Sequence, residues 1–156
     1  YISLPDSGDW DIVAGTEDAT VDFWVKHDDH AGTEVYVVQF EDANNQWSIY
    51  HVHGTGIYFN VQSASSSVVQ INSGDEIADT NWHHIALVKD ATVYKLYLDG
   101  TEIGTTTDAS VDTFAGALRV GSDGTSAFAG YIDELRISKE IARWTANFTP
   151  PTRAYS

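Results

Sequence analysis

The chain has 156 residues, and its 8 Lys and Arg against 23 Asp and Glu give a formal net charge of −15. This acidity excludes a non-specific nucleic-acid binder and argues against docking to an anionic membrane, because both partners are bound through cationic clusters. Since 42% of the residues are hydrophobic and 12% are aromatic, the chain is too apolar for a disordered acidic segment, and we expect one folded domain over residues 1–156.

Alternation of apolar and polar residues predicts ten short strands. In chain order they cover residues 21–25, 35–40, 47–53, 57–62, 68–71, 84–89, 93–98, 102–104, 118–121 and 131–138. Turn signals such as Gly54-Thr55-Gly56 and Asp99-Gly100 separate them, and this pattern is typical of an all-β antiparallel sandwich. The one stretch with a helical rhythm is 139–144, where we expect a single helical turn.

Missing residue types limit the chemistry further. Without cysteine the chain forms no disulfide, thiolate zinc site or cysteine nucleophile. No apolar run is long enough to span a bilayer, and the first residues lack the layout of a signal peptide. Methionine is absent even at position 1, so we expect the chain to be a module taken from a larger protein.

No arrangement of residues predicts catalysis. The nucleophile elbow G-x-S-x-G is absent. Glycoside hydrolysis needs two carboxylates across one sugar, but acidic pairs such as Glu17-Asp18 and Asp28-Asp29 are adjacent and expected in turns. Asp133-Glu134 lies inside a predicted strand, where adjacent side chains point to opposite faces. We therefore expect a protein that is not an enzyme.

The histidines give a weak indication of a metal site. His51 and His53 stand two residues apart on a predicted strand, which lets both rings reach one ion, but no third ligand has an obvious spacing. His27 and His30 flank two aspartates in what we expect to be a polar loop.

Aromatic and amide side chains gather in residues 47–62, a composition that suits a sugar ligand. Carbohydrate C–H faces stack on Trp and Tyr rings, and sugar hydroxyls bond to Asn, Gln, Asp and His. The candidate ligand-binding residues are Trp47, Tyr50, His51, His53 and Tyr58, with Asn60 and Gln62 facing away from the apolar set like the two tyrosines. The alternative is that Trp47 lies in the core and the tyrosines line the rim of the sandwich.

Motifs in the second half of the chain carry a family resemblance. They are Trp82-His83-His84-Ile85-Ala86-Leu87-Val88, Tyr94-Lys95-Leu96-Tyr97-Leu98-Asp99-Gly100, Gly130-Tyr131-Ile132-Asp133-Glu134-Leu135-Arg136-Ile137-Ser138, and Ala142-Arg143-Trp144 followed by Phe148-Thr149-Pro150-Pro151. Their order and spacing resemble the laminin-G-like branch of the concanavalin A-like lectin/glucanase superfamily, in its bacterial and phage members. Residues 4–10 and 21–25 agree with it too, so the resemblance covers almost the whole chain.

This resemblance implies a curved jelly roll of two antiparallel sheets, with Trp24 and Trp82 in the core. It also implies binding rather than catalysis, because the E-x-D-x-x-E strand of the related laminarinases and lichenases is absent. Many relatives hold a structural calcium ion through an Asp on the last long strand, and Asp133 is the matching position. The alternative for Asp133 is pairing with Arg136 or with backbone amides.

Residues and resemblance together predict a non-catalytic, lectin-like module. We expect it to bind a neutral polysaccharide or glycan on the concave sheet or its rim loops, with a structural calcium ion. The rival expectation is a structural or adhesion domain of a phage tail or cell-surface protein that contacts other protein domains. Either role predicts a location outside the cell, at a cell surface or on a virion.

Overall fold

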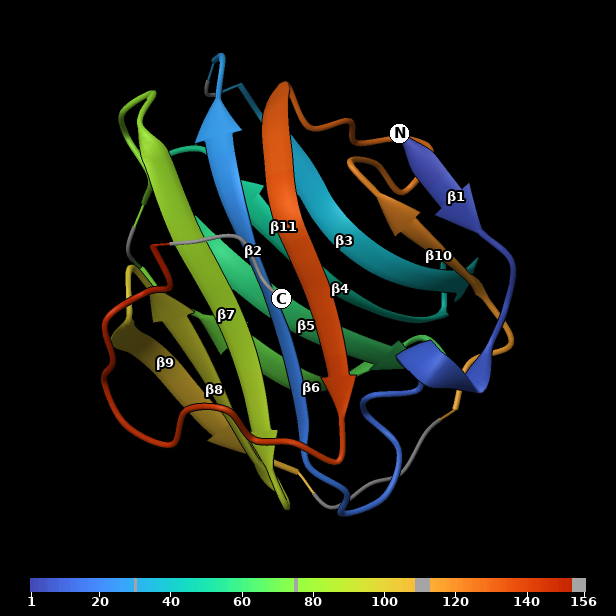
Figure 1. The fold of residues 1–156 in the computed structure, drawn as a ribbon. Helices are drawn as coiled ribbons and strands as arrows, with labels where there is room; N and C mark the ends of the chain where they lie inside the picture. Colours follow the sequence, from blue (N-terminus) through green and yellow to red (C-terminus); the bar gives the residue numbers. More distant parts are fainter. Residues whose placement is uncertain (30, 75, 109–112, 153–156) are drawn as a thin grey trace.

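The computed structural model describes residues 1–29, 31–74, 76–108 and 113–152, which form two antiparallel sheets packed face to face (Figure 1). Sheet A contains, in spatial order, β1 (Ile2–Leu4), β10 (Ala117–Val120), β3 (Thr33–Asp42), β4 (Asn45–Val52), β5 (Gly56–Ser63) and β6 (Ser66–Asn72). Sheet B contains β11 (Gly130–Lys139), β2 (Ala19–His27), β7 (Trp82–Asp90), β8 (Val93–Leu98) and β9 (Thr101–Thr107). A 3-10 turn, η1, spans Gly8–Trp10. Within the described residues, no helix has the length and apolarity needed to cross a membrane.

All ten predicted strands are present, so the predicted all-β sandwich is confirmed. The sequence did not predict β1, which has three residues and forms by pairing with β10 at the edge of sheet A. The helical turn predicted for 139–144 is wrong, because this segment bonds to β2 instead of to itself. The hydroxyl of Thr20 donates to the carbonyl of Ile141 (2.8 Å) and accepts from the amide of Arg143 (3.1 Å).

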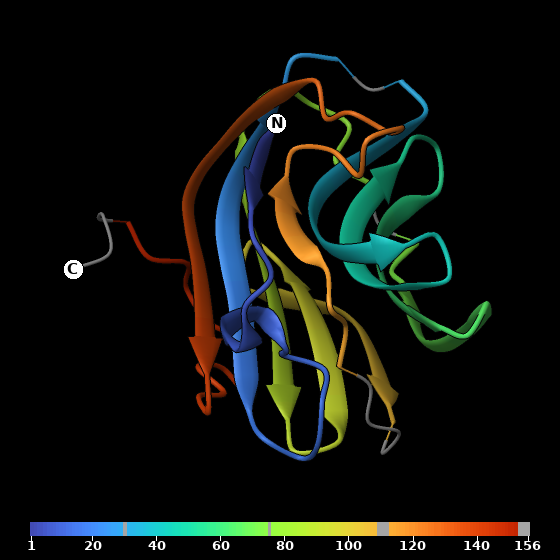
Figure 2. The same ribbon diagram turned by 90° about the vertical axis from the view of Figure 1, so that its right-hand side faces the viewer.

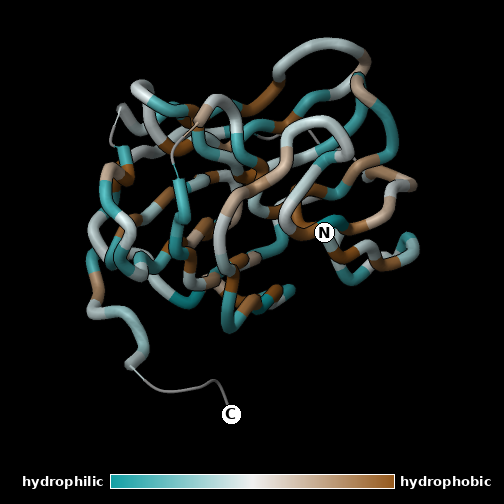
Figure 3. The backbone as a smooth tube through the Cα atoms, turned by 90° about the horizontal axis from the view of Figure 1, so that it is seen from above, coloured by the Kyte–Doolittle hydropathy of each residue, from teal (hydrophilic) through white to brown (hydrophobic). Residues whose placement is uncertain are grey.

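Alternating side chains fill the space between the sheets, and Figure 3 shows hydrophobic and hydrophilic residues alternating along parts of the backbone. On β5, Ile57, Phe59 and Val61 are buried in the core. Burying one such side chain stabilises the fold by about 1.5–3 kcal/mol. The tryptophan of β4, Trp47, is fully buried, and its indole N–H donates to the side-chain oxygen of Gln39 (2.8 Å).

A bulge in β3 changes which residues face the core. The register with β4 shifts between Val35 and Val37, so Tyr36 and Val37 both lie in the core although they are neighbours in sequence. Before the bulge, Glu34 is buried with only 1% of its surface exposed. The strand therefore presents a carboxylate to the interior at its second residue, Glu34.

The outer face of sheet B is covered by residues 140–150, which we call the C-terminal strap and which cross β7 and β8 in Figure 1. Trp144 and Phe148 of the strap stack on each other with ring centroids 3.9 Å apart. Both pack against a small cluster of buried residues made by Ala86, Val88 and Tyr97. The outer face of sheet A has no such cover from the described part of the chain.

The two tryptophans that the resemblance assigned to the core lie elsewhere. Trp82 is 44% exposed at the start of β7, with its ring 6.5 Å from that of Tyr131. Trp24 is half-buried on β2 and contacts the ring of His84 on the outer face of sheet B. That expectation is therefore wrong: the core is filled from sheet A by Trp47.

A buried lysine holds the loop that precedes β2. The ammonium group of Lys89, on β7, donates to the carbonyl oxygens of Val13 (3.3 Å), Ala14 (2.9 Å) and Gly15 (2.6 Å). The residue is 2% exposed, and burial lowers the pKa of its amine. Three carbonyl groups thus share one internal cation at this end of the sandwich.

Candidate functional site

The outer face of sheet A carries a polar groove of about 190 Å³. Figure 2 views the sandwich from the side and shows sheet A curving away from sheet B. The groove is lined by Thr33, Val35, Gln46, Ser48, Tyr50, Asn60, Gln62 and Asp123. Seven of these come from β3, β4 and β5, which alternate core and groove residues along their length.

Strand register aligns the polar residues of the groove into rows. Ser48 stands opposite Asn60, which stands opposite Gln70, and Gln46 stands opposite Gln62. Side chains that face each other in this way are within reach of a common ligand group. The hydroxyl of Ser67 donates to the side-chain oxygen of Asn60 and orients its amide. The floor of the groove therefore offers several hydrogen-bond donors and acceptors on a rigid sheet.

A pair of tyrosines stands beside this floor. Tyr50 and Tyr58 are directly opposite each other on β4 and β5, and their rings stack with centroids 5.0 Å apart and planes 9° apart. Burial raises the pKa of Tyr50, and the neighbouring Tyr58 raises it further. The Tyr50 hydroxyl therefore stays protonated at neutral pH and can donate a hydrogen bond.

The loop between β10 and β11 closes one side of the groove with a carboxylate. Asp123 accepts hydrogen bonds from the amides of Thr125 and Ser126, both at 2.7 Å, and its carbonyl accepts from the guanidinium of Arg119. Arg119 in turn lies over the ring of Phe40, 4.2 Å from its centroid. These contacts fix the loop against the sheet.

The structure places the predicted ligand-binding residues in three different environments. Tyr50 and Tyr58 lie on the groove face together with Asn60 and Gln62, as the alternation of β5 predicts. Trp47 and His51 point into the interior and have no exposed surface, so neither can touch a ligand in the groove. The side chain of His53 is 55% exposed beyond the end of β4 and binds Glu76 at 2.8 Å.

Sequence reasoning missed several groove residues. Gln46 and Ser48 share the face of Tyr50 at spacings of two residues, so the same alternation could have found them. Thr33 and Asp123 come from segments distant in sequence, and no local pattern identifies them. Of the predicted loop histidines, His27 is the last residue of β2 and is fully buried, whereas His30 lies outside the described residues.

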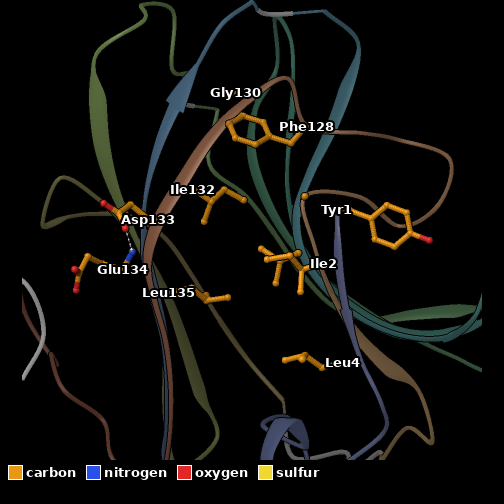
Figure 4. Close-up of a pocket in the computed structure, with 11 residues that line it drawn as sticks. Tyr1, Ile2, Leu4, Phe128, Gly130, Ile132, Asp133, Glu134 and Leu135 are labelled. Atoms are coloured by element: carbon orange, nitrogen blue, oxygen red, sulfur yellow. Dashed lines mark hydrogen bonds between the residues drawn. The ribbon is translucent and has the colours of Figure 1, made fainter.

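Asp133, the predicted calcium ligand, lies exposed on β11 just before a bulge in the strand. Its carboxylate accepts a hydrogen bond from the amide of Glu134 at 2.8 Å. Arg136 pairs instead with Asp22, through contacts of 3.0 and 2.8 Å. Figure 4 shows Asp133 and Glu134 on the side of β11 opposite Ile132. The position supplies one accessible carboxylate.

An apolar cleft of about 530 Å³ lies between β1 and β11, where the edges of the two sheets meet. Figure 4 shows Ile132 and Leu135 of β11 facing Ile2 of β1 across it. Ile2 is 63% exposed and Leu4 is 41% exposed. This edge of the sandwich therefore leaves apolar surface in contact with solvent.

Comparison with solved structures finds the same fold in proteins of low sequence identity. Domain 4 of AbnA, a GH43 extracellular arabinanase from Geobacillus stearothermophilus solved with arabinotriose, has a TM-score of 0.69 and 23% identity over 88% of this chain and 65% of that one. The Ruminococcus gnavus IT-sialidase CBM40 bound to α2,3 sialyllactose has a TM-score of 0.63 and 14% identity over 88% of both chains. Mouse laminin alpha1 chain domains LG4-5 have a TM-score of 0.67 and 14% identity over 88% of this chain and 38% of that one.

Two of these matches cover only part of the solved chain. This chain spans slightly under two thirds of the arabinanase domain and much less of the laminin fragment. Comparison with curated protein sequences gives no match. The Laminin_G_3 family model, described as concanavalin A-like lectin/glucanases superfamily, matches residues 1–143. The chain therefore belongs to the Laminin_G_3 family of the concanavalin A-like lectin/glucanases superfamily, as its sequence motifs predict.

Proposed function

We propose that the groove of sheet A binds a carbohydrate chain without reacting on it. The observation that carries this proposal is the stacked pair Tyr50 and Tyr58 beside rows of amide and hydroxyl side chains on an uncovered sheet. Aromatic rings accept the C–H face of a sugar, and the polar rows bond its hydroxyls. Proteins of the same fold solved with arabinotriose and with sialyllactose support this ligand class.

Charge favours a neutral glycan as the ligand. The chain has a net charge of −15, which repels polyanions at long range, and Asp123 adds a carboxylate at the groove itself. Among the described residues that line the groove, Asp123 is the one acidic side chain. Hydrolysis of a glycosidic bond uses two carboxylates, so the groove supports binding and not turnover.

The test is binding to a panel of neutral polysaccharides, arabinan included, by affinity electrophoresis and calorimetry. We expect a dissociation constant of roughly micromolar to millimolar, because water competes for exposed sugar sites. Tyr50→Ala and Tyr58→Ala should each weaken binding roughly threefold to tenfold, since an aromatic contact contributes about 0.5–1.5 kcal/mol. Tyr131→Ala is the matched control, as Tyr131 is 56% exposed and lies on sheet B. Unchanged affinity in both groove variants contradicts the proposal.

We also propose a structural calcium ion at Asp133, the position that the family resemblance implies. The accessible carboxylate at the β11 bulge supports it. Calcium would take its other oxygens from backbone carbonyls and water. Calcium should raise the melting temperature of chelator-treated protein, and Asp133→Ala should abolish that rise. Asp6→Ala, another exposed carboxylate, should leave it intact. A full calcium response in Asp133→Ala overturns this assignment.

The second candidate function is contact with a protein partner through the apolar cleft. Exposed Ile2 and Leu4 at the cleft support it, because apolar surface on an edge strand is a common interaction surface. Ile2→Glu should abolish any self-association seen by sedimentation, without changing glycan affinity. A wild-type chain that is monomeric and binds glycan supports the carbohydrate proposal and contradicts self-association through the cleft. For either function we propose a location outside the cell, at a cell surface or on a virion.

A further inference from the structure

We infer that His27, Glu34 and His51 form a binding site for a divalent transition-metal ion, best suited to Zn²⁺. The three residues come from the end of β2, the start of β3 and the end of β4. One ligand atom from each lies within 4.8 Å of the others, and the three form the one such His, Asp or Glu group among the described residues. This site is separate from the groove and from Asp133.

The distances from the Glu34 carboxylate to the two histidines match a zinc coordination shell. The Nδ1 atom of His27 lies 3.0 Å from Oε2 of Glu34, and Nδ1 of His51 lies 3.5 Å from the same oxygen. Zinc bonds to nitrogen and carboxylate oxygen are about 2.0–2.1 Å long, so ligands of a tetrahedral ion stand roughly 3.3 Å apart. Two imidazoles and one carboxylate favour zinc over calcium or magnesium, which prefer all-oxygen shells.

Burial gives a physical reason for an ion at this place. His27 and His51 have no exposed surface, and Glu34 is 1% exposed. Enclosing a carboxylate and two imidazoles costs free energy unless charge and hydrogen bonds compensate for it. A dication between the three groups neutralises the carboxylate and takes a lone pair from each ring.

Two of the three ligands are also oriented by a hydrogen bond on their far side, and the third has a more distant carboxylate there. The Nε2 atom of His27 lies 2.8 Å from the Tyr36 hydroxyl, and Oε1 of Glu34 accepts the amide N–H of Ala129 at 3.1 Å. The Nε2 atom of His51 faces Oε1 of Glu76 at 3.9 Å. Metal-binding histidines usually have such an outer partner, which fixes the tautomer that leaves Nδ1 for the metal.

Two side chains link the buried cluster to the surface. Glu76 has 25% of its side chain exposed and lies between buried His51 and exposed His53, whose Nδ1 is 2.8 Å from the Glu76 carboxylate. On the other side the ring of Phe128 closes the site, 4.9 Å from His27. Glu76 is therefore a partly exposed carboxylate beside the cluster, and Phe128 packs against the opposite side.

The test titrates chelator-treated protein with Zn²⁺ by calorimetry and with Co²⁺ by visible absorption. We expect one equivalent of Zn²⁺, and a Co²⁺ spectrum typical of a four-coordinate ion with a water molecule as its fourth ligand. Glu34→Gln and His27→Gln should each weaken Zn²⁺ binding at least tenfold. Tyr36→Phe, which keeps the ring and removes only the contact to His27, should weaken it about tenfold and guards against misfolding of the other variants.

Two control variants separate this site from surface histidines. His83 sits between Asp99 and Asp79, but the two carboxylates contact opposite nitrogens of its ring, so the three cannot share one ion. His83→Gln and His53→Gln should therefore keep the Zn²⁺ affinity of the wild type. No Zn²⁺ binding by the wild type overturns the inference. Wild-type Zn²⁺ affinity in all of Glu34→Gln, His27→Gln and Tyr36→Phe also overturns it. Loss of Zn²⁺ binding only in a control variant does the same.

Discussion

The two outer faces of the sandwich are equivalent in architecture but opposite in exposure. On sheet B, the C-terminal strap covers the strands with Trp144 and Phe148. On sheet A, the rings of Tyr50 and Tyr58 and the amides around them meet solvent in an open groove. Both faces carry aromatic and polar groups, but among the described residues the strap covers the strands of sheet B alone. The comparison indicates that the face left uncovered is the one available to a ligand.

The two faces also differ in the burial and the partners of their carboxylates. On sheet B, fully buried Asp22 is held by Arg136, and His84 lies 3.5 Å away from the same carboxylate. The carboxylate of this network is enclosed, and the guanidinium group is partly exposed. On sheet A, Asp123 stands at the groove wall, where it bonds its own loop and reaches solvent. Substitutions on sheet B should therefore affect stability, and substitutions in the groove should affect binding.

The largest expected effect is that of Arg136→Met. Removing the guanidinium leaves the carboxylate of Asp22 buried without its cation, which should lower the free energy of unfolding by about 3 kcal/mol. Urea denaturation measures the change. Arg143→Met is the control, because Arg143 is exposed and bonds the hydroxyl of Ser138 instead. Equal stability of the two variants would show that the Asp22 pair contributes little.

Removal of the strap contact should have a smaller effect. Phe148→Ala deletes a partly buried ring that packs on Tyr97, and should lower the free energy of unfolding by roughly 2 kcal/mol. The strap can approach the sheet here because residue 100 is a glycine. Its φ is +78°, and a Cβ there would lie 1.9 Å from the carbonyl oxygen of Phe148. The same denaturation experiment on Ile141→Ala, whose side chain is exposed, should give a change below about 0.5 kcal/mol. A strap that contributes nothing would leave all three proteins equal.

The smallest effect concerns the pH dependence of His83, at the rim of sheet B. Burial lowers the pKa of this ring, but hydrogen bonds and charge from Asp99 and Asp79 outweigh it, so the pKa is raised above 6.5. A raised pKa in the folded state gives stability that is complete below pH 6.5 and is lost as the pH rises through the folded value. The stability difference between wild type and His83→Gln should therefore shrink from pH 5.5 to pH 8.5. A constant difference would contradict this assignment.

Local alternation explains why the fold and one part of the groove were predictable. On β5 the buried residues Ile57 and Phe59 alternate with Tyr58 and Asn60, and the sequence alone assigns the faces. The same rule applies to Trp47, which is enclosed because it falls on the core side of β4. The prediction of Trp47 as a ligand-binding residue was wrong because aromatic and polar residues were grouped by proximity in sequence and not by the face of the strand.

Features that depend on long-range contact could not be predicted. The β3 bulge reverses the alternation of core and outward-facing side chains after Tyr36. No residue type in the strand predicts this bulge. The cluster of His27, Glu34 and His51 joins three strands, so its spacing in sequence follows no metal-binding motif. The strap was expected to turn as a helix at 139–144, because hydrogen bonds from Thr20 to its backbone are invisible in the sequence.

Lys89 gives the sandwich an ionic cross-link that no chelator can remove. Its ammonium group occupies the centre of three carbonyl oxygens, the place that a bound cation would take, but it is attached to β7 by covalent bonds. Ala19 pairs with Lys89 at one end of β2 and His27 lies at the other, so the lysine and the histidine cluster are roughly 25–30 Å apart. Stripping metal from the protein should therefore loosen one end of the molecule while the other stays closed, and hydrogen exchange along β2 would record the difference as a gradient.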